Sequence, residues 1–299
     1  MTARNLARRA EILAGIREFF RREGFLEVET PIRIPRPLPE AHIDPVESEG
    51  WFLQPSPEIC MKPLVAAGLR RIFQVCKAFR RGERGRRHLP ELTLLEWYAA
   101  GETYREVMER AEALILFLAR RLGRGDRLAY GGVEIDLAPP WPRLSVAEAF
   151  RRFAGVSPEE ALAADRFDEI LALEVEPRLD PTRPVFLVDY PAACGALARL
   201  NPADPTTAER CELYLGGLEL LNGFSELTDP QEQRRRFERD AGIRRARGQR
   251  DPGSPERFLE ALSRLPDCAG CALGVDRLVM LFCDAATIDE VVAFPPEAL

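Results

Sequence analysis

The dipeptide Gly216-Gly217 joins two runs in which apolar and polar residues alternate, and this feature constrains the fold most. Two successive residues with positive φ form a tight hairpin turn, and glycine adopts that conformation without strain. The turn predicts that Tyr214 pairs with Glu219 and that Glu212 lies on the same sheet face. Carboxylates on one face repel each other unless a cation or water separates them. The stretch therefore predicts either a cation site or a solvated acidic hairpin.

Other segments predict helices placed between long strands. Their boundaries are set by capping residues, glycine or proline. The expected elements are a helix over 5–22, a strand-like segment over 25–31, strands over 71–80 and 91–99, a helix from Thr103 to about Leu122, helices beginning after Ser145 and Asp229, a strand over 184–190 and a helix over 275–283. Strands joined by hairpins, with helices between them, predict an α+β domain in which helices flank an antiparallel β-sheet.

Composition excludes several classes of protein. The net charge of -6 argues against a surface that binds nucleic acid everywhere. The longest apolar run, 111–119, is too short to span a bilayer, and the N-terminus lacks a signal-peptide core, so we expect a cytoplasmic protein with no membrane partner. An odd number of cysteines, seven, predicts reduced thiols. Two histidines, His42 and His88, are too few for most Ser-His or multi-His mechanisms.

Two further segments have the chemistry of a phosphate site. The segment 77–88, KAFRRGERGRRH, carries six lysines and arginines in a predicted hairpin, and Arg80 ends the incoming strand. One guanidinium group can donate hydrogen bonds to two phosphate oxygens at once. A run of charged residues is nevertheless often only a solvated part of the surface. The segment 270–277, GCALGVDR, turns from a small-residue strand into a helix that begins with Asp276 and Arg277. With the acidic hairpin, these segments together predict a site for a magnesium nucleotide.

Three ordered motifs resemble the catalytic domain of class II aminoacyl-tRNA synthetases, in particular the lysine-type branch. They are GFLEVETP at 24–31, the stretch from Phe79-Arg80 through HLPELT at 88–93, and LGVDR at 273–277. The stretch NGFSEL at 222–227 is also similar to the lysine type. The helix before the first motif starts within the first few residues, so we expect residues 1–299 to form a single catalytic domain without an anticodon-binding domain. The stretches at 56–58, 96–98 and 271–274 resemble the elongation factor P (R)-β-lysine ligase family.

This resemblance implies an ATP-dependent amino acid ligase that forms AMP and pyrophosphate. It would activate lysine or (R)-β-lysine as an aminoacyl-adenylate and transfer it to a lysine of elongation factor P. The expected cofactors are ATP and Mg²⁺. The expected partners are elongation factor P as acceptor, a lysine-type amino acid and a second copy of the chain in a homodimer, with Ile12 or Phe25 facing that interface. A role for tRNA is not expected.

The resemblance also assigns residues. Glu212 and Glu219 would hold Mg²⁺, Arg80 would contact the α-phosphate, and Arg277 would bind the nucleotide from the other side, which makes Arg80 and Arg277 the catalytic residues. The full nucleotide set is Arg80, Arg81, Gly82, Glu83, His88, Glu219, Leu220, Gly274 and Arg277. The amino acid set is Ser56, Pro57, Glu58, Tyr98, Glu226 and Ala272.

Within the amino acid set, Glu58 would pair with the backbone-side ammonium, whereas Tyr98 and Glu226 would hold the side-chain amine. Strand parity puts Glu226 on the face opposite Glu219, so we expect Gly223 to kink the strand and redirect Glu226.

Three positions depart from the family pattern of the second motif. Gly82 stands at a glutamate position, Leu89 at an asparagine position and Leu92 at the position of a phenylalanine that stacks on adenine. Aromatic contacts and hydrogen bonds each contribute on the order of 1 kcal/mol. We therefore expect weaker or altered adenine recognition, with Glu83 as the substitute polar group.

Two alternatives stay open. A tRNA-directed enzyme would use the arginines of the helix after Asp229 as an RNA-binding face, and these are Arg234, Arg235, Arg236, Arg244, Arg245 and Arg247. A degenerate regulatory paralogue would bind an amino acid without activating it. Amino-acid-dependent pyrophosphate exchange separates a ligase from such a binding module.

Overall fold

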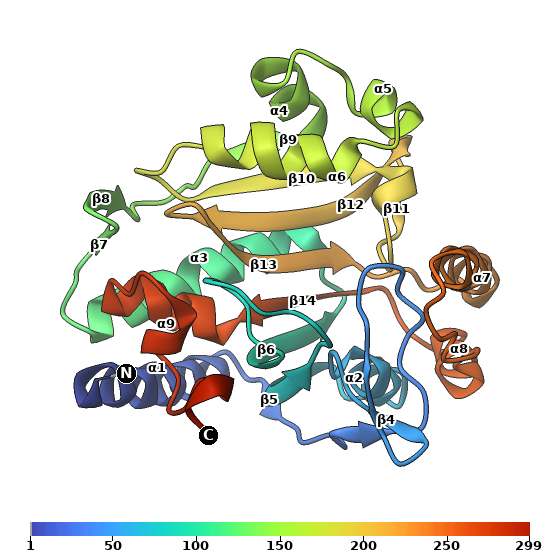
Figure 1. The fold of residues 1–299 in the computed structure, drawn as a ribbon, viewed down its shortest axis with the longest axis horizontal. Coiled ribbons are helices and arrows are strands. Elements are labelled where there is room, and N and C mark those ends of the chain that lie inside the picture. The colour runs from blue at the N-terminus through green and yellow to red at the C-terminus, as the bar shows by residue number, and fades with distance from the viewer. Residues whose placement is uncertain (1) are drawn as a thin grey trace.

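The computed structural model describes residues 2–299, and Met1, the first residue of the expected 1–299 domain, lies outside them (Figure 1). Its strands are β1 (Leu26–Glu27), β2 (Arg33–Ile34), β3 (Val46–Ser48), β4 (Trp51–Leu53), β5 (Arg71–Phe79), β6 (Glu91–Ala100), β7 (Arg127–Tyr130), β8 (Val133–Asp136), β9 (Arg143–Ser145), β10 (Val185–Pro191), β11 (Leu200–Asn201), β12 (Asp204–Leu215), β13 (Leu218–Ser225) and β14 (Cys268–Gly274). The large sheet has the order β1-β5-β6-β14-β13-β12-β10-β9, with β11 on β12. Strands β2, β4 and β3 form a second sheet, and β7 pairs with β8.

Most neighbours in the large sheet run antiparallel, as the hairpins predict. Only the edge pairs β1–β5 and β9–β10 are parallel. The expected α+β fold is therefore confirmed, with one parallel pair at each edge. The strand-like segment expected over 25–31 shortens to β1, because the chain leaves the sheet after Val28, whose N–H still donates to the carbonyl of Phe73.

The helices follow the capping signals of the sequence. They are α1 (Ala3–Arg22), α2 (Glu58–Ala66), α3 (Tyr104–Arg121), α4 (Val146–Phe153), α5 (Pro158–Ala163), α6 (Phe167–Ile170), α7 (Pro230–Ala246), α8 (Glu256–Leu262) and α9 (Val275–Cys283), with short turns η1 (Leu171–Val175), η2 (Glu176–Arg178), η3 (Ala192–Cys194), η4 (Ile288–Glu290) and η5 (Pro296–Ala298). Thr103 and Glu106 form a capping box at α3, and the Asp229 carboxylate caps α7. No helix within residues 2–299 combines the length and the apolar character that a bilayer crossing requires.

Two sets of helices cover the two faces of the large sheet (Figure 1). Helices α1 and α3 pack on one face, and α9, which continues from β14, completes that apolar core. On the other face, α2, α7 and α8 lie at one side of the sheet and α4 to α6 cover its β10 end. Ile12 and Phe25 are buried in the first core, so the expectation that they face a dimer interface is wrong.

A β-bulge in the β12–β13 hairpin decides which side chains share a face. Tyr214 pairs with Glu219 as expected, but Glu212 pairs with Asn222, so β13 holds one extra residue at Leu220. The extra residue reverses the alternation, and Glu219, Asn222 and the later Glu226 then point to the same side of the sheet.

The expected kink at Gly223 is wrong. Gly223 pairs regularly with Cys211 and Cys271. A Cβ at this position would lie 2.8 Å from the Cβ of Cys271 and 2.9 Å from a methyl group of Val107 in α3. Glycine is therefore required because α3 packs closely on the sheet.

Candidate active site

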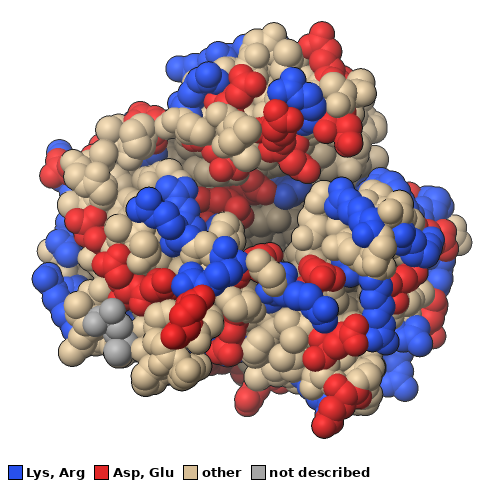
Figure 2. Space-filling model, in the orientation of Figure 1, with Lys and Arg blue, Asp and Glu red and all other residues tan. Residues whose placement is uncertain are grey.

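A cleft opens on the sheet face that α3 does not cover, with acidic and basic side chains around its mouth (Figure 2). Its floor includes the paired residues Glu96, Ala272 and Asn222. The same row of the sheet continues beside the cleft to Gln74 at one end and Glu212 at the other. The cleft is lined by the expected site residues Ser56, Glu58, Arg80, Glu83, His88, Tyr98, Glu219, Leu220, Ala272, Gly274 and Arg277. The chain thus brings basic and acidic groups that are far apart in sequence into one cavity.

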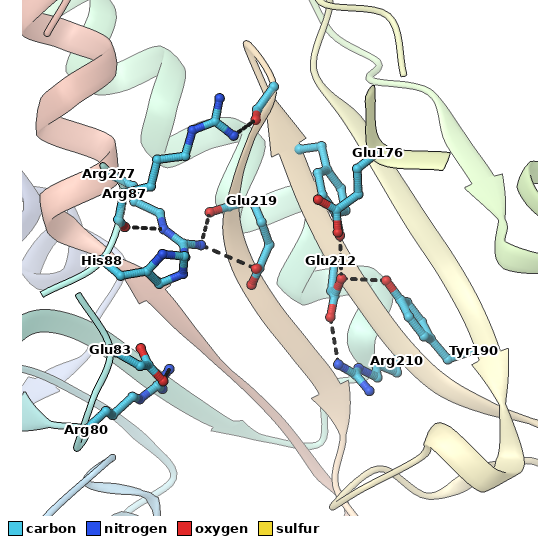
Figure 3. A network of polar contacts seen from close by, with 12 residues as sticks. Arg80, Glu83, Arg87, His88, Glu176, Tyr190, Arg210, Glu212, Glu219 and Arg277 are labelled. Carbon is cyan, nitrogen blue, oxygen red and sulfur yellow. Dashed lines mark hydrogen bonds and ion pairs between the residues drawn. The ribbon is translucent and has the colours of Figure 1, made fainter. Parts of the chain in front are cut away.

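Arg277 is held in place at the basic end of the cleft (Figure 3). Its Nη1 donates to the carbonyl oxygen of Glu219 at 2.7 Å and lies 3.3 Å from Oε2 of the same residue. Its Nη2 lies 2.6 Å from Nε2 of His88, and because an arginine only donates, this nitrogen of His88 is the acceptor. Burial and the Arg277 charge lower the pKa of His88, which agrees with a neutral imidazole.

Arg80 and Arg87 complete the basic end. Arg80 donates from Nε to the carbonyl of Pro55 at 3.4 Å and lies 3.9 Å from Glu83. Arg87 donates to the carbonyl of Gly217 at 2.8 Å and so ties the β5–β6 loop to the turn of the second hairpin. Arg80, Arg87 and Arg277 all line the same cavity, which suits binding of a polyphosphate.

Glu212 and Glu219 lie on neighbouring strands and face the same side of the sheet (Figure 3). The Oε2 atom of Glu212 accepts from the hydroxyls of Tyr190 at 2.6 Å and Tyr214 at 2.8 Å, while Oε1 accepts from Arg210 at 2.6 Å. Restricted solvation and the nearby Glu212 raise the pKa of Glu219, although its side chain is 40% exposed to the cleft. A cation between the two carboxylates would relieve this repulsion.

Glu212 and Glu219 fit a magnesium ion that is also bound by the phosphates of a nucleotide. Within residues 2–299 no three His, Cys, Asp or Glu side chains form a preformed metal cage. Magnesium in nucleotide sites is commonly held by only one or two carboxylates, with substrate phosphates and water as the other ligands. The pair Glu212 and Glu219 matches that donor set.

The other end of the cleft is acidic and buried. The hydroxyls of Ser56 and Tyr98 donate to the two oxygens of Glu96, at 2.7 and 3.0 Å. Burial and the neighbouring Glu58 raise the pKa of Glu96 to about 8. The same causes raise the pKa of Glu40, from the loop before β3, to about 7. This end of the cleft favours a cationic ligand, because such a ligand would stabilise the ionised carboxylates.

Glu58 and Glu226 are bridged by Lys62, a residue that the sequence analysis did not single out. Lys62 is 1% exposed, and its ammonium contacts Glu58 in the same helix and Oε2 of Glu226 at 2.5 Å. Burial raises the pKa of Glu226 to about 8 although Lys62 opposes the shift. Oε1 of Glu226 has no hydrogen-bond partner among residues 2–299. Glu226 therefore retains an acceptor for a further cationic donor.

Gly270 makes room for this arrangement. A Cβ at position 270 would lie 2.3 Å from ring atoms of Tyr98 and 2.8 Å from Oε1 of Glu226. The space that this glycine leaves is therefore filled by these two side chains and not by a ligand. Gly274 differs, because a Cβ there would meet nothing closer than 3.8 Å, so this glycine leaves open space in the cleft.

Several expected site residues do not line the cleft. Pro57 precedes α2, and Gly82 lies in the β5–β6 loop. Arg81 turns away, with its N–H on the carbonyl of Asp44 and its guanidinium 3.9 Å from the carboxylate of the same residue. Glu212 and Glu226 are buried beside the cleft rather than on its surface.

The arginines of α7 do not form a free basic face. Arg236 and Arg244 are buried, and Arg244 donates to the backbone of the loop before β3. Three others pair with acidic side chains, and these are Arg234 with Glu256, Arg235 with Glu232 and Arg245 with Asp251. These internal pairs argue against the RNA-binding alternative.

The sequence gives little signal for three other residues in or beside the cleft. Glu40 lies in a proline-rich loop, and Lys62 follows Glu58 at a spacing that predicts only a local helical pair. Glu176, whose carboxylate lies 3.2 Å from the Tyr214 hydroxyl, belongs to the irregular segment after α6. Each reaches the site through contacts with residues far along the chain.

Comparison with known proteins finds relatives along nearly the whole chain. The family model for tRNA synthetases class II (D, K and N) matches residues 1–298. A protein of Vibrio atlanticus (strain LGP32) named elongation factor P–(R)-beta-lysine ligase is 38% identical, over 98% of this chain and 96% of the relative. Proteins of the same name from Salmonella gallinarum and Klebsiella pneumoniae subsp. pneumoniae are 39% and 40% identical, each over 97% of this chain and 94% of the relative. The chain therefore belongs to the class II tRNA synthetase family and is a relative of the elongation factor P–(R)-beta-lysine ligases.

Proposed function

We propose that the protein activates a diamino acid, lysine or (R)-β-lysine, with ATP and transfers it to a lysine of elongation factor P. One observation carries this proposal, namely that a single cleft has arginines at one end and buried carboxylates at the other. Arginines suit a triphosphate, and carboxylates suit the two ammonium groups of a diamino acid. Relatives that span nearly the whole chain bear the corresponding ligase name.

The nucleotide is assigned to the basic end. Arg80 is proposed to contact the α-phosphate, Arg277 to bind the phosphates from the other side, and His88 to lie near the terminal phosphates. Gly274 leaves room for this approach, because no neighbour lies within 3.8 Å of its missing Cβ. Leu89 and Leu92 form an apolar wall, and Glu83 is the proposed polar partner of the base.

Mg²⁺ is proposed to accompany ATP as part of the substrate, where it would neutralise phosphate charge as a Lewis acid. Glu212 and Glu219 are its proposed protein ligands. Arg210, Tyr190 and Tyr214 hold Glu212 in a fixed orientation. Hydrogen bonds of this kind commonly orient metal-binding carboxylates.

The amino acid is assigned to the acidic end. Glu58 is proposed to bind the ammonium nearest the carboxylate, while Tyr98 and the unpartnered Oε1 of Glu226 bind the distal amine. The substrate carboxylate then points toward Arg80 and the α-phosphate. Ala272, between Glu96 and Asn222 on the cleft floor, is proposed to limit the depth available to the substrate.

The reaction proceeds in two steps. A carboxylate oxygen of the amino acid attacks the α-phosphorus, the bond from this phosphorus to the bridging oxygen breaks, and pyrophosphate leaves. The amine of the acceptor lysine then attacks the adenylate carbonyl, forms an amide, loses a proton and releases AMP. Neither step needs a side-chain nucleophile, because alignment and charge neutralisation supply most of the rate enhancement. Homodimerisation stays a prediction from the family resemblance.

Mass spectrometry of elongation factor P tests the transfer step. With protein, ATP, Mg²⁺ and lysine or (R)-β-lysine, the acceptor is expected to gain the mass of one amino acid less one water. Norleucine, which lacks the distal amine, and a reaction without ATP serve as controls and should give no gain. An unchanged acceptor mass with both diamino acids would remove the transfer step from the proposal.

A further inference from the structure

Lys62 is the cation at the centre of the acidic end of the cleft. The chain has 42 lysines and arginines, but only Lys62 and Lys77 are lysines. Lys62 is 1% exposed, whereas the side chain of Lys77 is 46% exposed and pairs with Glu91. Nearly all basic residues of the chain are arginines, yet the cation buried between the carboxyl groups of Glu58 and Glu226 is a lysine. A compact ammonium fits between two carboxylates where a planar guanidinium would not.

The ammonium of Lys62 links two distant parts of the chain. It contacts Glu58 one helical turn earlier in α2 and Glu226 just beyond β13. Its Nζ lies 5.8 and 5.9 Å from the ring centres of Phe224 and Phe258, which keep the side chain from solvent. One ammonium therefore holds both carboxylates that the proposed function gives to the two substrate amines.

We propose that Lys62 is a positioning residue that holds the carboxyl groups of Glu58 and Glu226 at the spacing a diamino acid needs and supplies the positive charge that favours ionisation of Glu226. This inference rests on the proposed function, which supplies the roles of the two carboxylates. Burial disfavours the ionised form of Glu226 and the Lys62 charge opposes that effect, so without this charge Glu226 would ionise only at a still higher pH. A protonated Glu226 would lose the negative charge that attracts an ammonium ion.

The surroundings of Lys62 support a charge-balancing role. The titratable groups that face it are Glu58 from α2, Glu226 from the end of β13, Glu96 and Tyr98 from β6, Glu40 from the loop before β3 and Cys268 from β14. Burial alone would lower the pKa of Lys62, but Glu226 and Glu58 raise it above its usual value. Lys62 therefore stays protonated across the neutral range.

The test is the pH dependence of the KM for the amino acid in Lys62→Gln, measured by ATP–pyrophosphate exchange from about pH 6.5 to 8.5. Glutamine keeps N–H donors but removes the charge. We expect the KM to rise about 30-fold over wild type at pH 7, and the ratio to fall below about 10 at pH 8.5, as Glu226 begins to ionise in the variant as well. The KM for ATP should change less than about threefold.

Three further variants make the result decisive. Lys77→Gln is the matched control and should behave as wild type. Lys62→Arg keeps the charge but not the shape, so its defect should be the same at every pH. Lys62→Met repeats the loss of charge, with thermal denaturation and the KM for ATP showing that each variant is folded.

The possible outcomes separate the two proposals. If wild type shows amino-acid-dependent exchange and Lys62→Gln matches it at every pH, this inference is wrong and the proposed function stands. The inference is equally wrong if Lys62→Gln loses amino acid and ATP binding together by a pH-independent factor, since that indicates a structural role. If wild type shows no such exchange, both proposals fail.

Discussion

Replacing Arg277 by methionine is expected to lower the rate of ATP–pyrophosphate exchange by about 10³-fold, since guanidinium groups that neutralise transferring phosphoryl groups have effects of this order. Arg277 is oriented by the carbonyl of Glu219 and by His88, so its guanidinium is already held in the cleft where the proposed function puts the phosphates. Methionine keeps the unbranched stem and removes the charge. Initial exchange rates at saturating amino acid measure the effect.

Arg84→Met is the matched control for this variant. Arg84 lies in the same β5–β6 loop as Arg80 but pairs with Asp289 and Glu297, both at 2.8 Å, outside the cleft. Its removal is expected to change exchange less than about threefold, in line with exposed ion pairs. An Arg277→Met protein that stays within tenfold of wild type would contradict the assignment of Arg277.

Replacing Glu226 by glutamine is expected to raise the KM for lysine or (R)-β-lysine by about 100-fold, because losing one partner of a buried ion pair removes roughly 3 kcal/mol. The KM for ATP should stay unchanged, since Glu226 lies at the acidic end. The KM for norleucine should exceed the KM for lysine by a smaller factor in this variant than in the wild type. Steady-state exchange with each amino acid gives the comparison.

The KM for the diamino acid should depend on pH in the wild type, because the pKa of Glu226 is raised to about 8. A carboxylate with a raised pKa ionises later as pH rises, so the wild-type KM for the diamino acid should fall from about pH 6 to 8. Glu96, whose pKa is also about 8, contributes in the same direction. The glutamine variant should show a shallower fall over that range.

Glu112→Gln is the control for a buried glutamate outside the cleft. Glu112 lies on α3, on the opposite face of the sheet, and burial raises its pKa as well. Its KM values should match wild type. If Glu226→Gln also has wild-type KM for both diamino acids, Glu226 does not bind the distal amine.

Local sequence signals predict the elements but not all of their side-chain directions. Glycine turns and capping residues place the turn of the β12–β13 hairpin, both ends of α3 and α9 and the start of α7 within two residues of their observed positions. The bulge at Leu220 leaves no such signal, because an extra leucine in an apolar run looks like ordinary strand. It nevertheless decides that Glu219 and Glu226 share a face.

The site was predictable where a residue belongs to a motif and not where it depends on tertiary contacts. Arg80, His88, Glu219 and Arg277 line one cleft as expected. Lys62 and Glu40 reach the acidic end through packing between segments distant in sequence, and no local spacing encodes that. Gly223 and Gly270 show the same limit, since their neighbours appear only in the folded chain.

The central claim is that the carboxylate of a diamino acid meets the α-phosphate of ATP in this one cleft. Amino-acid-dependent exchange of labelled pyrophosphate into ATP by the wild-type protein measures that encounter without any acceptor. The account predicts exchange with lysine or (R)-β-lysine and none above background with norleucine. Absence of exchange with both diamino acids, in protein that binds ATP, would contradict it.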